Sequence, residues 1–349
     1  MRVPNAGVTL VDVTLRDGSH PMRHQYTEEQ IAAIAGALDR AGVSVIEATH
    51  GDGLGGSSIQ YGQSLLAEKD LLRAATGAVV QSQVAVLLIP GIGTMEDLVL
   101  AVEQGVQVVR VATHCTEADI SRQHIGMAKT LNTTAVGFLM MAHMIEAPAL
   151  AEQARLMASY GADVVYVVDS AGALTPDMTK SRVSAVRQAV DCAVGFHGHN
   201  NLGLAIGNSL AAVEEGATWI DGALAGLGAG AGNAQLEMLV AVMQKRSIPT
   251  GIDLYRVIDA ADGLVRPIMS RPVIADGDSV IIGYAGVYST FLWHARHAAE
   301  RFGVDARDIL VELGKRNMVG GQEDMILDAA LDLVERLNKR RGHSAYNSS

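Results

Sequence analysis

The feature that most constrains this fold is a regular alternation of short apolar runs and longer helical segments over roughly the first 225 residues. Each short run is rich in Val, Ile and Leu, and an amphipathic segment follows it, as at residues 27–42 and 94–105. The runs occupy residues 8–15, 43–49, 83–89, 106–113, 133–140, 163–169, 193–199 and 218–224. This pattern is typical of parallel strands that are covered by helices.

Eight such units predict an α/β protein with a closed (β/α)8 TIM barrel, and an open doubly wound sheet is the competing architecture. Thr27 and Thr94 are the expected N-caps of two helices, and Gly42 is an expected helix end. The glycine-rich stretch at 51–56 formally matches a dinucleotide-binding fingerprint. It follows the second strand, however, and places Asp52 where a pyrophosphate needs neutral backbone, so we expect no such site.

The pattern changes after residue 232, where helical segments follow one another without intervening strands. The last 70 or so residues keep a helical periodicity. We therefore predict a catalytic barrel over residues 1–262 and a mostly helical C-terminal domain over residues 263–349. A barrel does not need these helices for its own closure, so we expect them to form a lid or to dock a partner.

Composition limits the classes of partner. The net charge is −11 without any run of like charges, which argues against a nucleic-acid surface or an anionic membrane surface as the partner. The N-terminus lacks the pattern of a signal peptide, and no apolar run is long enough to cross a bilayer. We expect a soluble, cytoplasmic protein whose two cysteines are reduced thiols.

The polar residues that end the apolar runs are the candidate site residues, because catalytic groups of such barrels lie at the C-terminal ends of the strands. They are Arg16, Asp17, His20, Glu47, His50, His114, Asp169, Ser170, His197 and His199. His50 and His114 are left out of the predicted site, because such histidines are more often structural than ligands. His197 and His199 are two apart in an extended run, so both imidazoles point to one face, as metal ligands do. Asp17 can supply a third ligand.

Structural alternatives to a metal site stay open at this point. The two histidines can be buried and hydrogen-bonded, Arg16 and Asp17 can form an ion pair that Glu47 supports, and Asp169 can cap a turn. A ligand set of nitrogen and oxygen without thiolate suits an octahedral divalent ion with room for water and a chelating 2-oxo acid. Covalent imine catalysis is disfavoured, because no lysine ends a strand.

Several longer motifs carry a family resemblance. LRDGSH (15–20) and HGHNNLG (197–203) resemble the metal-dependent lyases and aldolases of the HMG-CoA-lyase-like superfamily. Further segments are similar to the 4-hydroxy-2-oxovalerate aldolases of aromatic and steroid side-chain catabolism. These segments are EATHGDGLGGSS (47–58), VATHCTEAD (111–119), VVDSAGA (167–173), GAGAGN (228–233), GYAGVYSTF (283–291) and GGQED (320–324). The resemblance extends over nearly the whole chain.

The resemblance implies that Asp17, His197 and His199 bind manganese, with cobalt or magnesium as other possible ions. It implies that Arg16 stabilises a pyruvate enolate and that His20 is the catalytic base. These roles suit a retro-aldol cleavage, which removes a hydroxyl proton and places negative charge on the departing enolate.

The resemblance also implies contacts with the rest of the substrate. Ser170 and His197 are expected to touch the substrate, and Tyr288 is expected near its 4-hydroxyl group. Leu87 and Leu88 are expected to form the wall that receives the alkyl group of the aldehyde. A methylene is worth only about 1–3 kcal/mol of discrimination, so the preferred aldehyde length is left open.

The implied reaction splits 4-hydroxy-2-oxopentanoate, or its hexanoate homologue, into pyruvate and a short aldehyde. The aldehyde is expected to pass to a partner, an acylating acetaldehyde dehydrogenase, and the aromatic residues within 284–293 are expected to form an interface or a lid. An acyl-CoA lyase or synthase of the same superfamily is the alternative, although the segment at 226–233 lacks the cysteine expected there. A non-catalytic scaffold is a third hypothesis, which the complete polar set disfavours.

Overall fold

The computed structural model describes residues 7–319 and 322–346, and it begins with a closed parallel barrel in which each strand pairs with the next and β8 pairs with β1. The strands are β1 (Thr9–Leu15), β2 (Val45–Ala48), β3 (Gln83–Leu88), β4 (Val108–His114), β5 (Thr134–Met140), β6 (Val164–Asp169), β7 (Ala193–Gly198) and β8 (Trp219–Gly222). The predicted (β/α)8 barrel is therefore confirmed, and the open sheet is excluded.

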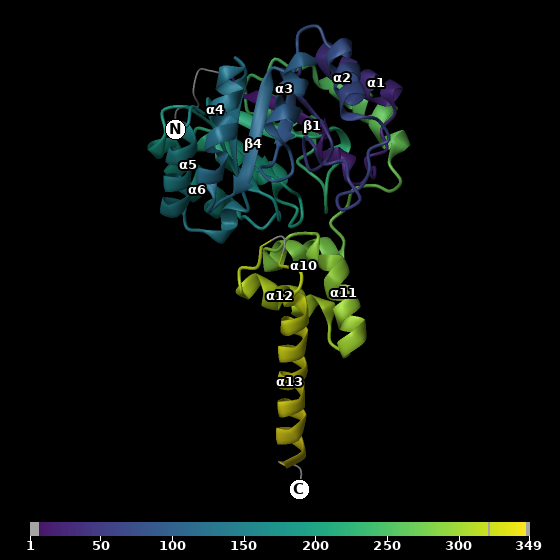
Figure 1. Ribbon diagram of the computed structural model, residues 1–349, viewed down its shortest axis with the longest axis vertical. Helices are drawn as coiled ribbons and strands as arrows, with labels where there is room; N and C mark the ends of the chain where they lie inside the picture. The colour runs from purple at the N-terminus through teal and green to yellow at the C-terminus, as the bar shows by residue number, and fades with distance from the viewer. Residues whose placement is uncertain (1–6, 320–321, 347–349) are drawn as a thin grey trace.

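Helices surround the barrel (Figure 1). They are α1 (Glu28–Ala41), α2 (Glu68–Ala78), α3 (Met95–Glu103), α4 (Arg122–Thr130), α5 (Ala147–Ser159), α6 (Pro176–Ala189), α7 (Ala205–Glu214) and α8 (Leu236–Lys245). Thr27 and Thr94 begin α1 and α3 with capping boxes, as predicted, because each hydroxyl accepts a hydrogen bond from a backbone N–H of the first turn. Gly42 ends α1 with a φ of 88°.

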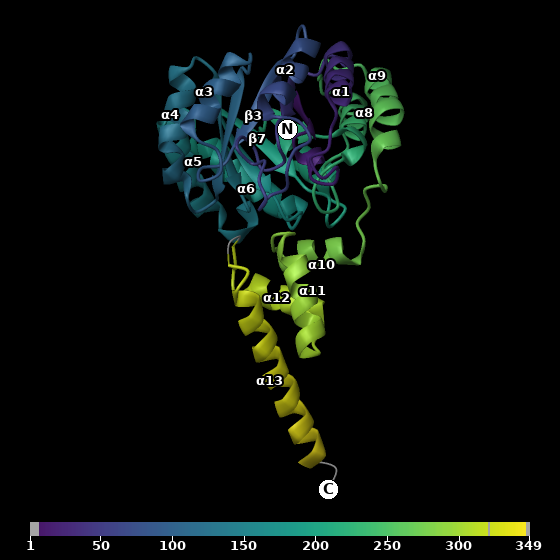
Figure 2. The same cartoon turned by 45° about the vertical axis from the view of Figure 1, so that its right-hand side comes forward.

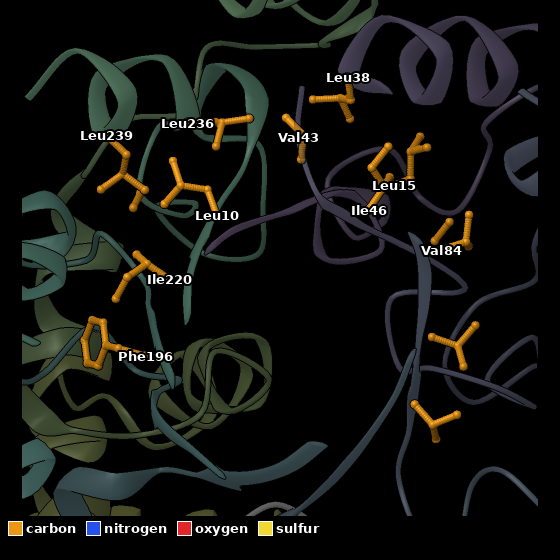
Figure 3. Close-up of a cluster of buried hydrophobic side chains, with 14 of the residues drawn as sticks. Leu10, Leu15, Leu38, Val43, Ile46, Val84, Phe196, Ile220, Leu236 and Leu239 are labelled. Carbon is orange, nitrogen blue, oxygen red and sulfur yellow. The ribbon is translucent and has the colours of Figure 1, made fainter. Parts of the chain in front are cut away.

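Two apolar layers hold the barrel together because successive strand residues point to opposite faces. Leu10, Ile46 and Val84 point outward and pack against the helices (Figure 3). Val11 and Val45, one position along from the first two, belong to a second cluster inside the barrel. The barrel interior is therefore filled by side chains, and an open cavity lies at the end of the barrel where the site residues gather.

The C-terminal part of the chain is helical. α9 (Leu254–Ala260) packs back on α1, and the chain then forms α10 (Gly277–Ala285), α11 (Phe291–Phe302), α12 (Ala306–Lys315) and α13 (Met325–Tyr346). Figures 1 and 2 show α10 to α13 as a lobe below the barrel, with α13 extending away from it.

The lobe has a core of its own, which includes Phe291, Ile309 and Leu313. The first two residues of the predicted motif at 320–324 lie outside the described residues. Within the described part of the chain, no helix combines the length and the apolar character needed to cross a membrane.

Candidate active site

A cavity of about 430 Å³ lies at the C-terminal end of the barrel strands, under the α10–α11 connection. Eight of the nine residues to which the resemblance assigns a metal, catalytic or substrate-contact role line it. They are Arg16, Asp17, His20, Leu87, Ser170, His197, His199 and Tyr288. Leu88 is the exception. No lysine is among the described residues that line this cavity.

The chain turns sharply after β1 and brings three consecutive functional groups to the cavity. A short 3-10 helix, Asp17–Ser19, follows Arg16 directly and directs His20 toward the loop after β2. Gly51 of that loop lies so close to the His20 ring that a Cβ atom at residue 51 would be 2.6 Å from it. The glycine therefore makes room for the imidazole.

Asp17 is buried and accepts three hydrogen bonds. Its Oδ2 atom accepts from Asn233 Nδ2 at 2.7 Å and from the Ala229 N–H at 3.1 Å, and its Oδ1 atom accepts from Arg16 at 2.8 Å. A carboxylate has about four acceptor positions, so one remains for another ligand. Burial alone would raise the pKa of Asp17, but the nearby His199 and Arg16 outweigh it and hold the pKa well below its usual range.

His197 and His199 are both buried, and their ring centroids are 5.0 Å apart. The Nδ1 atom of His197 is 2.8 Å from Asp221 Oδ2, and the Nδ1 atom of His199 is 3.3 Å from the Ala229 carbonyl oxygen. These contacts leave each Nε2 atom for a ligand, and that of His199 lies 4.0 Å from Asp17 Oδ2. Burial lowers the pKa of His199 to about 4, so its imidazole is neutral at pH 7.

A buried network of charged side chains inside the barrel contacts these groups. Arg16 donates to Glu47 at 2.7 Å, as the sequence alternative anticipated. Arg110 lies 2.9 Å from the same Glu47 oxygen and donates to Asp221 at 2.5 Å. Sequence reasoning missed Arg110 and Asp221, although each is a lone charged residue within a near-continuous apolar strand.

Arg16 retains one unused donor. Its Nη2 atom is buried and has no hydrogen-bond partner among the described residues. Because Arg16 lines the cavity, this donor is available to an oxygen of a bound molecule. The guanidinium keeps its charge, since Glu47 and Asp17 raise its pKa against the effect of burial.

The residues expected to contact the rest of the substrate are distributed around the cavity. The Ser170 hydroxyl accepts a hydrogen bond from the Met141 N–H at 3.1 Å. Burial raises the pKa of Tyr288, so its hydroxyl stays protonated and can donate. Leu87 faces the cavity, whereas Leu88 packs in the outer apolar layer, because neighbouring residues of β3 point to opposite faces.

Other candidates have structural partners. Asp169 accepts hydrogen bonds from the N–H groups of Ala173 and Leu174 at 2.8 and 3.0 Å, so it caps the turn after β6. In the described part of the chain, one set of His and carboxylate groups places its ligand atoms within 4.8 Å of one another: His20, His24 and Asp52. This set differs from the predicted ligands Asp17, His197 and His199. Sequence reasoning did not single out His24.

Comparisons with known proteins agree with this geometry. Residues 7–264 match the HMGL-like family, and residues 273–335 match the DmpG-like communication domain. A protein of Thermomicrobium roseum named 4-hydroxy-2-oxovalerate aldolase is 59% identical over 95% of this chain and 94% of its own length. A protein of Chloroflexus aggregans with the same name is 59% identical over 94% of this chain and 95% of its own length.

Solved structures share the fold at low sequence identity. The N-terminal domain of a putative aldolase from Bacteroides vulgatus has a TM-score of 0.70 at 22% identity, with 81% of this chain and 94% of that chain covered. The carboxyl transferase domain of Rhizobium etli pyruvate carboxylase has a TM-score of 0.76 at 18% identity, with 95% and 61% covered. The chain belongs to the HMGL-like family and, within it, is an enzyme of the 4-hydroxy-2-oxovalerate aldolase group.

Proposed function

We propose that this chain cleaves 4-hydroxy-2-oxopentanoate, or its hexanoate homologue, to pyruvate and a short aldehyde. The observation that carries the proposal is that one cavity contains an ionised Asp17, the His197 and His199 pair, and the Arg16 guanidinium with an unused buried donor. Carboxylate and imidazole groups bind a divalent ion, and a guanidinium binds the oxygens of a 2-oxo acid. The name of the relatives supports the same reaction.

Asp17, His197 and His199 are the proposed ligands of a divalent ion, with manganese the expected ion and cobalt or magnesium as alternatives. The donor set fits, because Asp17 is ionised, His199 is neutral, and Asp221 orients His197 through its other ring nitrogen. When bound, the ion would act as a Lewis acid toward the 2-oxo group of the substrate.

His20 is the proposed base. It would take the proton of the 4-hydroxyl group as the C3–C4 bond breaks, so that the oxygen forms the aldehyde carbonyl and the bonding electrons move to C3 and onto the 2-oxo oxygen. The free donor of Arg16 would stabilise the charge on that oxygen, which appears only as the bond breaks. His20 would then return the proton to C3, which becomes the methyl group of pyruvate.

The opposite part of the cavity is proposed to hold the leaving aldehyde. Tyr288 would donate a hydrogen bond to the 4-hydroxyl oxygen, Ser170 would contact the oxo acid, and Leu87 would contact the alkyl group. Leu88 is left out of this set, because it packs in the layer between the barrel and its helices.

The helical lobe is proposed to dock an acylating acetaldehyde dehydrogenase, which would oxidise the released aldehyde. Its match to a communication domain and the position of Tyr288 at the cavity support this role. We also propose that the catalytic barrel ends near residue 262 and that residues 263–349 form the docking domain. A cytoplasmic location stays a prediction from the sequence.

The test offers metal-loaded protein two substrates in separate reactions: 4-hydroxy-2-oxopentanoate and a hydroxymethylglutaryl thioester. We expect pyruvate from the first and no acetoacetate from the second. Acetoacetate without pyruvate would reassign the chain to the thioester lyases. No product from either substrate, with the metal shown to be bound, would favour the scaffold hypothesis.

A further inference from the structure

His20, His24 and Asp52 form a compact cluster beside the proposed catalytic ligands, and none of them belongs to the Asp17, His197 and His199 set. We propose that this cluster is a second metal site, which takes a transition ion of the zinc type. We infer further that the bound ion inhibits the enzyme. The inhibition rests on the proposed function of His20 as a base, whereas the binding itself does not.

The geometry of the cluster suits a small ion. One nitrogen of each histidine and one oxygen of Asp52 all lie within 4.8 Å of one another. An ion bonded to each at about 2.0–2.2 Å would draw these atoms to about 3.4 Å apart, so modest side-chain rotations complete the site. Asp52 can make such a rotation, since its side chain is 27% exposed at the cavity edge.

His24 is held in place before any ion binds. Its backbone is left-handed, with a φ of 59°, and its ring stacks on His50 with a centroid distance of 3.6 Å. Its Nδ1 atom is 3.2 Å from the Ser19 hydroxyl and accepts a hydrogen bond from the Gly51 N–H at 3.4 Å, and the ring also has a hydrogen bond with the backbone of Tyr61, so an ion would replace one of these contacts. Burial, with the charges of His50 and His20, lowers the pKa of His24 to about 4, so the ligand form predominates at neutral pH.

His50 supports the site without being a ligand. Its Nδ1 atom accepts a hydrogen bond from the Asp52 N–H at 3.0 Å, and its Nε2 atom contacts the Gly62 carbonyl oxygen at 3.0 Å. His50 is not among the described residues whose ligand atoms lie within 4.8 Å of one another. The same contacts fix the loop that carries Asp52. Residues that hydrogen-bond to a metal ligand or to its loop commonly orient the ligand in this way.

Access separates this cluster from the catalytic set, because one of the cavities that His20 lines has none of Asp17, His197 and His199 in its wall. His20 lines two adjoining cavities, so the cluster can be reached from solvent. Two nitrogens and one oxygen, the same donor types as in the catalytic set, bind zinc more tightly than manganese, because affinity rises along the first-row series from manganese toward copper and zinc. An ion bound here would occupy a nitrogen of His20 and prevent that residue from accepting a proton.

The test dialyses manganese-loaded protein against increasing zinc and measures both metals in the protein. We expect the protein to take up one more zinc per chain than the manganese it loses, and pyruvate release to fall in parallel. His24→Asn removes the imidazole, and asparagine tolerates the left-handed backbone at this position. The variant should weaken zinc binding at least about 10- to 100-fold and relieve inhibition by the same factor. His297→Asn, which removes an exposed histidine on α11, is the matched control and should behave as the wild type.

Three results would overturn the site: zinc that replaces manganese one for one, no zinc uptake, or wild-type zinc binding by His24→Asn. Zinc bound at the cluster without any loss of pyruvate release would overturn the inhibition. The two proposals fail separately. If the protein binds zinc through His24 but releases no pyruvate with any metal, the second metal site is supported and the proposed aldolase function is contradicted. If the protein releases pyruvate but takes up no zinc, the proposed function is supported and the second site is contradicted.

Discussion

Asp17 is the residue on which the proposed metal site depends most, because it is the only anionic group in the predicted ligand set. Asp17→Asn should lower manganese content and pyruvate release together, each by at least about tenfold, since an amide is a weaker ligand. Elemental analysis of the purified variant measures the first effect and a pyruvate assay the second. His20→Ala is the control: it should lose about 10²–10⁴-fold in turnover and keep its manganese. Wild-type manganese content in Asp17→Asn would remove this residue from the ligand set.

Arg110 connects the two carboxylates of the buried network, Glu47 and Asp221, and it is 1% exposed. Arg110→Met would leave Glu47 and Asp221 without their shared partner, and we expect the free energy of unfolding to fall by about 3–5 kcal/mol. Arg110→Lys should lose less, because an ammonium keeps the charge but cannot bridge both carboxylates with a rigid fork. Urea unfolding measures both variants. Equal stability of Arg110→Met and the wild type would mean that the network adds nothing to the fold.

At the residue scale, the sequence predicted which residues lie at the site better than it predicted which side chains they contact. The polar residues that end the strands follow from the barrel pattern, and six of the ten line the cavity. The Arg110–Asp221 pair joins residues 111 apart, which no local pattern reveals. Leu88 could have been excluded, because strand alternation allows only one of two neighbours to face the cavity.

Among the elements, α12 and α13 are joined by one buried carboxylate. Both oxygens of Glu312 accept from Arg336, at 2.8 and 3.0 Å, and Arg316 donates to the same group at 3.0 Å. The hydrogen bonds from Arg336 contribute most to lowering the pKa of Glu312 from 4.5 to about 2. Folding thus favours the ionised form, and its stabilisation is complete above about pH 4.5 and is lost as the pH falls toward 2.

Glu312→Gln should therefore lower the stability of the lobe at pH 7 by about 1–3 kcal/mol and reduce the loss of stability on acidification below pH 4.5. Thermal unfolding between pH 6 and pH 3 measures the effect. Glu335→Gln removes an exposed carboxylate from the same helix pair and should match the wild type. An acid profile of Glu312→Gln that overlays the wild type would show that this contact does not stabilise the lobe.

The helices and strands also show which structural features the sequence could not predict. Strand and helix positions in the barrel follow from apolar periodicity and caps. The aromatic residues within 284–293 were expected to form an interface or a lid, and α10 ends among them at Gly286 with a φ of 66°. Phe291 lies in the lobe core, and its ring contacts that of Tyr288 at a centroid distance of 6.3 Å; Tyr288 also lines the cavity, while Trp293 is 62% exposed.

At the scale of the whole molecule, the lobe has exposed apolar side chains, among them Trp293, Leu327 and Leu331. Trp293→Asp should weaken association with a co-expressed acylating acetaldehyde dehydrogenase, with a loss of about 2 kcal/mol if the side chain is buried in the interface. Tyr255→Asp changes an aromatic residue of α9 that is 79% exposed, and it is the matched control. Size exclusion with affinity measurement distinguishes them. Equal loss of affinity in both variants, or separate elution of the wild-type proteins at micromolar concentration, would contradict docking through the lobe.

The most direct test of a metal-dependent pyruvate aldolase is pyruvate release from 4-hydroxy-2-oxopentanoate by one protein sample in three states: as purified, after a chelator has removed bound metal, and after manganese has been restored. We predict that chelation abolishes pyruvate release, that manganese restores it, and that Asp17→Asn is not restored at the same manganese concentration. Full pyruvate release by chelated protein that elemental analysis shows to be free of divalent metal would contradict the proposed chemistry.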